Sequence, residues 1–235
     1  MIPVGLLLAS AFMASVLSEP TSVETFADLW ERLGKVPLDR ILMHPAPGTA
    51  TPADVLRLAD AAEKRLCELV DGVLVEKAMG QRESRLAFWL GHKIANYLDE
   101  HDRGIAFGAD GPSQLSEVQV RFPDLGFIAY DRIPAGADPD TPMPDWIPNL
   151  AIEVISPGNT KGEMLRKLKD FFAAGVELVW YIDPAKRTVR VYTSVDDCTI
   201  LKNGDTLDGG DVLPGFRVSI RELFEKARKI RPGRK

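Results

Sequence analysis

The sequence has few of the residues on which many enzyme classes depend, with 2 cysteines, 3 histidines and aromatic residues at 8% of the total. Cys67 and Cys198 lack the close spacing of a zinc or redox motif, so we expect both to be reduced core residues. His44, His92 and His101 show no metal-ligand spacing and have no serine or cysteine motif beside them. The sequence therefore gives no indication of a zinc centre or of a histidine-activated nucleophile.

An excess of positive charge is also absent. Lys and Arg total 29 against 34 for Asp and Glu, a formal net charge of −5, so any contact with nucleic acid must come from a local basic surface. The apolar stretch within residues 1–20 has no basic residue before it and is too short to span a bilayer. We therefore expect a cytoplasmic protein without a membrane segment, with Met13 favoured over Met1 as the start of translation.

Length and composition fit one large globular domain, since the chain has 235 residues, 45% hydrophobic and 27% charged. We expect residues 1–50 to form an N-terminal extension that is partly helical or disordered. Residues 51–225 are expected to form the main domain, and residues 226–235 a basic tail. The sequence shows no internal repeat and no low-complexity region.

Local patterns predict alternating helices and strands. Thr51 is a good N-cap before Pro52, which predicts a helix to about Arg65, and Asp71-Gly72 joins two short apolar runs as in a β-hairpin. This order predicts an α/β or α+β domain with a mixed sheet. The remaining predictions are helices over about 22–34, 83–100, 161–174 and 219–229, strands over 104–109, 117–122, 125–130, 150–155, 177–183, 187–193 and 199–203, and a long surface loop over 131–148.

The strand predicted over 150–155 contains one carboxylate, Glu153, in an otherwise apolar run. A buried carboxylate loses roughly several kcal/mol of solvation unless it is paired or binds a metal. Asp124 follows Pro123 at the start of a neighbouring strand, where its side chain can meet Glu153. Two adjacent carboxylates suit Mg²⁺ or Mn²⁺, so the pair predicts metal-assisted attack of water on a phosphodiester.

A cation near this pair would orient the attacking water and stabilise the developing charge. The helix predicted after Glu153 has an apolar stripe that includes Met164 and Phe171, and Lys167 lies between these two residues in sequence. Lys167 is three residues after Met164 and four before Phe171, a spacing that places it beside the buried stripe of the helix. This position makes it the candidate cation.

Several motifs together resemble one known family. They are Pro123-Asp124, the EVISP motif at 153–157, the RKLKDFFAAGVELVWYIDP segment at 166–184, and ELVDG at 68–72 with the VEKAMG that follows it. The set resembles the Uma-two family of endonucleases, within the PD-(D/E)XK, or restriction-endonuclease-like, superfamily, over about residues 50–220. The resemblance implies a mixed central β-sheet flanked by helices and divalent-metal hydrolysis of nucleic acids.

The resemblance also assigns residues. Asp124 is the first acid and Glu153 the second, and both would bind Mg²⁺ or Mn²⁺. The superfamily pattern has lysine two residues after the second acid, where this sequence has Ile155. Lys167 on the following helix matches the position that stands in for that lysine, with Lys161 as the runner-up. The backbone carbonyl of Ile155 could still bind the metal, because a carbonyl does not depend on side-chain identity.

The superfamily often supplies a further acid, and here it is either Glu68 or Glu83, between which the sequence does not choose. Structural alternatives stand beside these assignments. Asp124 could cap a turn, Glu153 could form a structural ion pair, and Lys167 could extend along the helix rim to solvent. Glu68 and Glu83 could be ordinary surface charges.

The hypothesis from the sequence is a Mg²⁺- or Mn²⁺-dependent endonuclease that cuts DNA in preference to RNA, the substrate resting on analogy of fold. The loop over 131–148 is expected to border the cleft, and a homodimer would suit cleavage of both strands. One alternative is a catalytically inactive nucleic-acid-binding or interaction module, favoured by Ile155 and the acidic net charge. Another is a metal-free two-carboxylate enzyme of the glycosidase kind, ranked low because few aromatics are expected at the surface.

Overall fold

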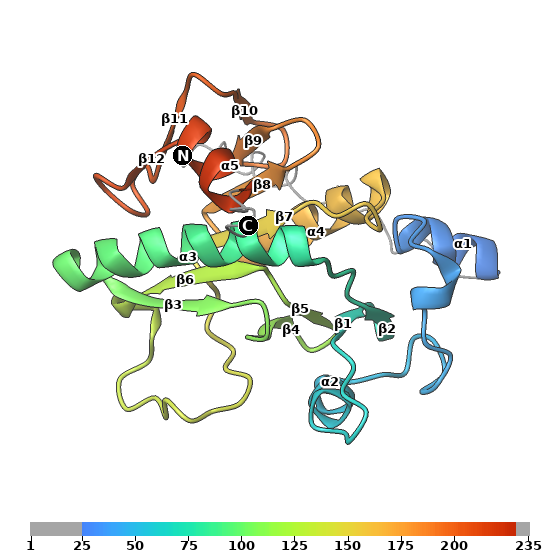
Figure 1. Cartoon of the computed structure of the whole chain (residues 1–235). Coiled ribbons are helices and arrows are strands. Elements are labelled where there is room, and N and C mark those ends of the chain that lie inside the picture. The colour runs from blue at the N-terminus through green and yellow to red at the C-terminus, as the bar shows by residue number, and fades with distance from the viewer. Residues whose placement is uncertain (1–24, 229–235) are drawn as a thin grey trace, which may run out of the picture.

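The computed structural model describes residues 25–228 of the chain (Figure 1). The apolar N-terminal stretch with its two candidate start residues, and most of the expected basic tail, lie outside the described residues. Within the described part, no helix is both long enough and apolar enough to cross a membrane.

The centre of the fold is a six-stranded mixed sheet, in which β7 and β8 run parallel and all other neighbours run antiparallel. Both β7 and β8 are buried along their whole length, as their continuous apolar sequences predict. The predicted mixed sheet is therefore confirmed. In spatial order the strands are β10 (Cys198–Leu201), β9 (Thr188–Tyr192), β8 (Leu178–Asp183), β7 (Leu150–Val154), β6 (Leu125–Ala129) and β3 (Gly104–Gly108).

A second sheet of four strands lies beside the first and contains the predicted hairpin. Asp71 and Gly72 both have positive φ, 50° and 73°, which is the backbone geometry that favours Asp-Gly in a two-residue hairpin turn. The order of the strands is β2 (Val73–Glu76), β1 (Cys67–Val70), β5 (Gln119–Arg121) and β4 (Ser113–Ser116), and a separate pair is formed by β11 (Thr206–Asp208) and β12 (Arg217–Ser219).

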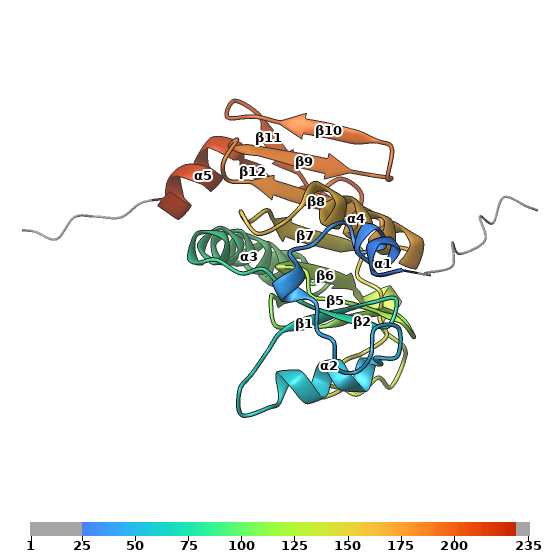
Figure 2. The same cartoon turned by 90° about the vertical axis from the view of Figure 1, so that its right-hand side faces the viewer.

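Helices cover both faces of the central sheet. One face packs against α3 (Gln81–His101) and α5 (Ile220–Arg228), and the other packs against α4 (Lys161–Ala174). Figure 2 shows the sheet between α3 and α4. Gly175 has a φ of 100° and ends α4, as predicted. The alternation along β7 follows these two layers, so that Ile152 and Val154 face α3 while Ala151 and Glu153 face α4.

The segment that precedes the hairpin in sequence packs against the hairpin. It contains α1 (Phe26–Arg32), the short 3₁₀ helix η1 (Leu38–Arg40) and α2 (Pro52–Ala59), and Figure 1 shows α2 beside β1. Thr25 caps α1 through a reciprocal capping box with Asp28. The shared core of this segment and the hairpin consists of Leu29, Leu33, Val36, Ile41, Val70, Val73 and Val75.

Two local predictions are wrong. The helix predicted to reach Arg65 ends at Ala59, because residues 62–65 are exposed and have no apolar face to bury. Cys67 is buried as expected, but Cys198 is exposed because β10 is an edge strand of the sheet.

Candidate active site

Asp124 and Glu153 come together at the end of the β6–β7 ladder. Leu125 of β6 lies opposite Ile152 of β7 in an antiparallel register, which sets Asp124 beside Glu153. Asp124 Oδ2 accepts a hydrogen bond of 2.7 Å from the backbone N–H of Val154. The carboxylate of Asp124 is therefore fixed by the backbone of the strand that carries Glu153.

Lys167 reaches the same place from α4. Its Nζ lies 3.1 Å from Glu153 Oε1 and 2.8 Å from Glu68 Oε1. Lys167 is 2% exposed, so its ammonium group is held inside the layer between the sheet and the helix. The helix position that the sequence predicted for this lysine is thus beside Glu153, and the ion pair foreseen as a structural alternative for Glu153 is present.

Arg121 of β5 lies behind Glu68. Its Nη1 donates to Glu68 Oε2 at 2.8 Å, and its Nε donates to Asp170 Oδ2 of α4 at 3.1 Å. Arg166 continues the network by donating 2.8 Å to Asp170 Oδ1. Arg121 and Asp170 are residues that the sequence reasoning did not assign. Their charges make Glu68 part of a buried network and not a surface charge.

A second lysine faces the first acid. Lys77 Nζ lies 2.8 Å from Asp124 Oδ1, and its side chain is 4% exposed. Lys77 is the first residue after β2, at the open end of the hairpin. Sequence reasoning missed it, although the VEKAMG motif already contained it, because only the packing of the hairpin on the central sheet brings it to Asp124. Each acid of the pair therefore has its own lysine.

Burial and neighbouring charges separate the two glutamates. Burial raises the pKa of Glu153 most strongly, and although Lys167 lowers it, Asp124 raises it again, so that it stands at about 7. Burial also opposes ionisation of Glu68, but Lys167 and Arg121 outweigh it and lower the pKa of Glu68 to about 2. The two glutamates share Lys167 but differ in their other neighbours, because Arg121 lowers the pKa of Glu68 whereas Asp124 raises that of Glu153.

The donor set of this pair fits a hard divalent cation. Within residues 25–228, no group of three or more His, Cys, Asp or Glu side chains could hold a metal. Mg²⁺ does not need such a group, since it commonly binds through one or two carboxylates and keeps several waters. The backbone N–H of Ile155 donates to Ile182 at 2.8 Å, and its side chain packs on the apolar cluster beneath α4. Ile155 is partly buried, and only its carbonyl could serve a metal.

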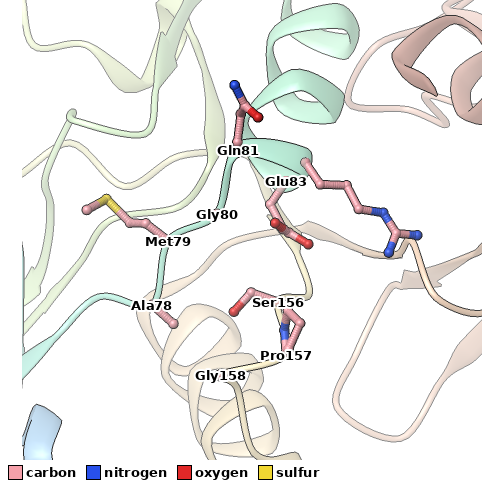
Figure 3. A pocket seen from close by; sticks show the side chains of 9 residues that line it. Ala78, Met79, Gly80, Gln81, Glu83, Ser156, Pro157 and Gly158 are labelled. Carbon is pink, nitrogen blue, oxygen red and sulfur yellow. The ribbon is translucent and has the colours of Figure 1, made fainter. Parts of the chain in front are cut away.

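A hollow of about 520 Å³ lies between the start of α3 and the loop that follows β7 (Figure 3). Residues 78–83 and 156–158 line it, and these segments begin directly after Lys77 and Ile155. Glu83 is 8% exposed, and its carboxylate is directed towards Ser156. No contact joins Glu83 to Asp124 or Glu153 among the described residues, so the two candidate further acids occupy different places.

The other predicted residues lie farther from the pair. Lys161 is the exposed first residue of α4 and makes none of the ion pairs found in the described part of the chain. Arg132 holds the base of the 131–148 loop by donating to the carbonyls of Ile147, at 3.3 Å, and Gly175, at 2.9 Å. The role of this loop beside a cleft stays a prediction.

Comparisons with known proteins agree on one family and one fold. The family Uma2, described as "Putative restriction endonuclease", matches residues 52–221. No curated protein matches the chain. A solved structure from Anabaena variabilis ATCC 29413, described as a "putative nuclease belonging to DUF820", superimposes with a TM-score of 0.64 at 19% identity, over 75% of this chain and 98% of that chain. The likeness supports the predicted mixed α/β nuclease fold.

Proposed function

Because the chain belongs to the Uma2 family of restriction-endonuclease-like nucleases, we propose that it is a divalent-metal-dependent endonuclease that hydrolyses phosphodiester bonds of DNA. The observation that carries this proposal is the contact of Asp124 with the strand of Glu153, which brings two carboxylates together beside two buried lysines. DNA is preferred to RNA by analogy of fold. A homodimer remains the assembly we propose for cutting both strands.

Asp124, Glu153 and the Ile155 carbonyl would hold Mg²⁺ or Mn²⁺. Such an ion supplies Lewis-acid charge stabilisation and promotes the attack of water on the phosphorus. The protein's own contribution is to keep both carboxylates in place. Asp124 is fixed by Val154, and Glu153 is fixed by Lys167. A preorganised pair loses little free energy to reorganisation when the substrate arrives.

Two lysines compete for the role of the missing lysine at position 155. We propose Lys167 first, because it contacts Glu153 directly and its charge lies against the acid of the central strand. Lys77 is the second candidate, because it contacts Asp124 and directly precedes the hollow. An ammonium group at either place would stabilise negative charge that develops on the phosphate.

The two further acids have different proposed roles. Both oxygens of Glu68 lie within hydrogen-bonding distance of a cation, Lys167 at 2.8 Å and Arg121 at 2.8 Å. We therefore propose that Glu68 positions Lys167 and does not bind the metal. Glu83 lines the hollow whose walls begin directly after Lys77 and Ile155, so it is the acid we propose as a further ligand, acting through water.

A catalytically inactive nucleic-acid-binding module is the second candidate function. Ile155 in place of lysine favours it, and so do the two lysines that already neutralise Asp124 and Glu153. This alternative predicts duplex binding that is insensitive to divalent metal and to loss of Glu153. The proposed nuclease predicts that both matter.

Cleavage of supercoiled plasmid with Mn²⁺ tests the proposal. The wild type is compared with E153Q, and with E225Q as a matched control on the exposed surface of α5. The nuclease is expected to lose at least about 100-fold in rate in E153Q and to keep its rate in E225Q. Equal cleavage by all three proteins would reject the site. Absence of cleavage in the wild type, with metal-independent DNA binding, would establish the inactive module, and a matched RNA duplex distinguishes the two nucleic acids.

A further inference from the structure

Residues 33–42 precede the family match and run between the hairpin and α4. Leu42 donates its backbone N–H to Leu74 of β2 at 2.9 Å. On the other side, Thr160 Oγ1 donates to the carbonyl of Gly34 at 2.5 Å. A Cβ on Gly34 would lie 2.3 Å from the backbone of Gly162. The two segments therefore approach so closely that only glycine fits at position 34. The segment is therefore packed on the two elements that carry Lys77 and Lys167.

Arg40 is the centre of this contact. Its guanidinium forms a bidentate pair with Glu163 of α4, with Nη1–Oε2 at 3.0 Å and Nη2–Oε1 at 2.7 Å. Nε donates to the carbonyl of Glu76 at 2.7 Å, and Nη1 also donates to the carbonyl of Gly158 at 3.0 Å. The side chains of Arg40 and Glu163 are 13% and 3% exposed. A charge-assisted bidentate pair of this kind fixes geometry as well as charge.

The three partners of Arg40 belong to three segments of the site. Glu76 directly precedes Lys77, and Gly158 belongs to the loop that follows β7. Glu163 lies one helical turn before Lys167 on α4. A single planar group therefore links the backbone next to one lysine with the helix that carries the other.

We propose that Arg40 is a positioning residue of the active site, which sets Lys77 against Asp124 and Lys167 against Glu153. This inference rests on the proposed nuclease function and extends it, because Arg40 lies outside the region matched by the family. Arg40 itself touches neither acid, so its effect passes through Glu76 and Glu163.

An Arg40→Lys variant tests this role, with Arg57→Lys as the matched control. Arg57 is an exposed arginine on α2 that also pairs with a carboxylate, at 2.9 Å. Lysine at position 40 keeps the positive charge but cannot bind two oxygens of Glu163 and two carbonyls at once. We expect kcat for plasmid cleavage to fall about 10- to 100-fold in R40K, since small misplacements of catalytic groups have effects of this size. KM for the plasmid is expected to stay within about threefold, because Arg40 does not contact substrate.

The position of Lys77 is read independently of cleavage by its reaction with a small amine-acylating reagent, measured by mass spectrometry of peptides. Lys77 is almost fully buried, and its labelling rate is expected to rise at least about fivefold in folded R40K and to stay unchanged in R57K. Folded R40K with kcat within about threefold of the wild type and unchanged labelling would overturn the proposal.

The two proposals fail in different ways. A wild type that does not cleave removes the nuclease function, and the labelling of Lys77 still decides the role of Arg40. If R40K does not fold, Glu163→Gln serves in its place, because Arg40 then keeps its two carbonyl bonds. E163Q is expected to change kcat and labelling in the same direction as R40K. Wild-type values of both in folded E163Q would overturn the positioning role.

Discussion

The ammonium group of Lys167 lies 3.1 Å from the carboxylate of Glu153, and both side chains are almost fully buried between β7 and α4. The same ammonium group lies 2.8 Å from Glu68. One cation thus stands between two buried acids that come from different sheets. Removal of the cation leaves two acids without this partner, whereas removal of either acid leaves the cation paired with the other.

The substitution Lys167→Met is therefore expected to be strongly destabilising. It leaves the buried Glu153 without its cation and Glu68 with Arg121 alone, and loss of one partner of a buried ion pair typically lowers the free energy of unfolding by about 3–5 kcal/mol. Lys169→Met, two residues along the same helix on its exposed side, is the control and is expected to change it by less than about 0.5 kcal/mol. Urea denaturation at pH 8 measures both. A K167M protein as stable as K169M would contradict the reading of Lys167 as the shared counter-ion.

Lys77→Met should separate activity from stability. Asp124 keeps its 2.7 Å hydrogen bond from Val154 without Lys77, so the fold is expected to persist. If Lys77 stabilises charge on the phosphate, the rate of plasmid cleavage falls about 100- to 1,000-fold. Cleavage is measured beside K169M and at matched thermal stability. Cleavage by K77M at the control rate would leave Lys167 as the lysine of the site.

The affinity for Mn²⁺ is expected to rise with pH and to level off above about 7. Burial, which Lys167 only partly offsets, raises the pKa of Glu153 to about 7, so below that pH a proton must leave before the carboxylate binds metal. The affinity then changes by about tenfold per pH unit well below 7. Calorimetric titration of the metal-free protein in two buffers of different ionisation enthalpy measures affinity and proton release together. E225Q should follow the wild type, and an affinity independent of pH would refute the role of Glu153.

Stability without metal should show the opposite trend for the same group. Because the folded pKa of Glu153 is raised above its ordinary value of 4.5, the folded state holds this proton more tightly, and its contribution to stability falls as pH rises from about 4.5 to 7. Glutamine at position 153 has no such proton. The free energy of unfolding of E153Q is therefore expected to rise relative to that of the wild type between about pH 5 and about pH 8, a range that spans the change. A difference that is constant over this range would contradict the raised pKa.

The two cysteines are expected to differ in reactivity. Burial raises the pKa of the Cys67 thiol to about 11, whereas Cys198 is exposed on β10. A thiol-reactive disulfide reagent should modify one thiol in the native protein and both in guanidinium chloride. Native reactivity should disappear in Cys198→Ser. Rapid modification of both thiols under native conditions would show that β1, which carries Cys67, becomes accessible in the folded protein.

The closeness of the two candidate acids, Asp124 and Glu153, could be predicted from the sequence because their signals are local. An apolar run with one carboxylate indicates Glu153, and Pro123 before Asp124 indicates the end of a strand. Lys167 was also predicted, from its place beside the apolar stripe of its helix, but Lys77 and Arg121 could not be assigned in the same way. Lys77 follows a separate hairpin, and Arg121 pairs with Glu68 across 53 positions of sequence. The contact of Lys77 with Asp124 depends on how the second sheet packs on the first, and the contact of Arg121 with Glu68 depends on the pairing of β5 with β1 within the second sheet. Periodicity along one chain contains neither piece of information.

Which strands lie at the edge of a sheet could not be predicted from the sequence either. Cys198 was expected in the core because free cysteines are usually buried, but that habit does not say whether the strand that carries the residue is central or at an edge. The exposed side chain of Ile200 on the same strand shows the same effect. Hairpin geometry, in contrast, was predictable, because Asp71-Gly72 suits the positive φ values of its turn.

Because it accepts the hydrogen bond from Val154, the side chain of Asp124 has two roles. It ends the ladder between two central strands by accepting a bond that a further backbone carbonyl would otherwise take, and it carries one of the charges of the site. Asparagine can take over the first role but not the second, whereas alanine loses both. Asp124→Asn is therefore the variant that separates the architecture of the sheet from its chemistry, and Asp124→Ala confounds them.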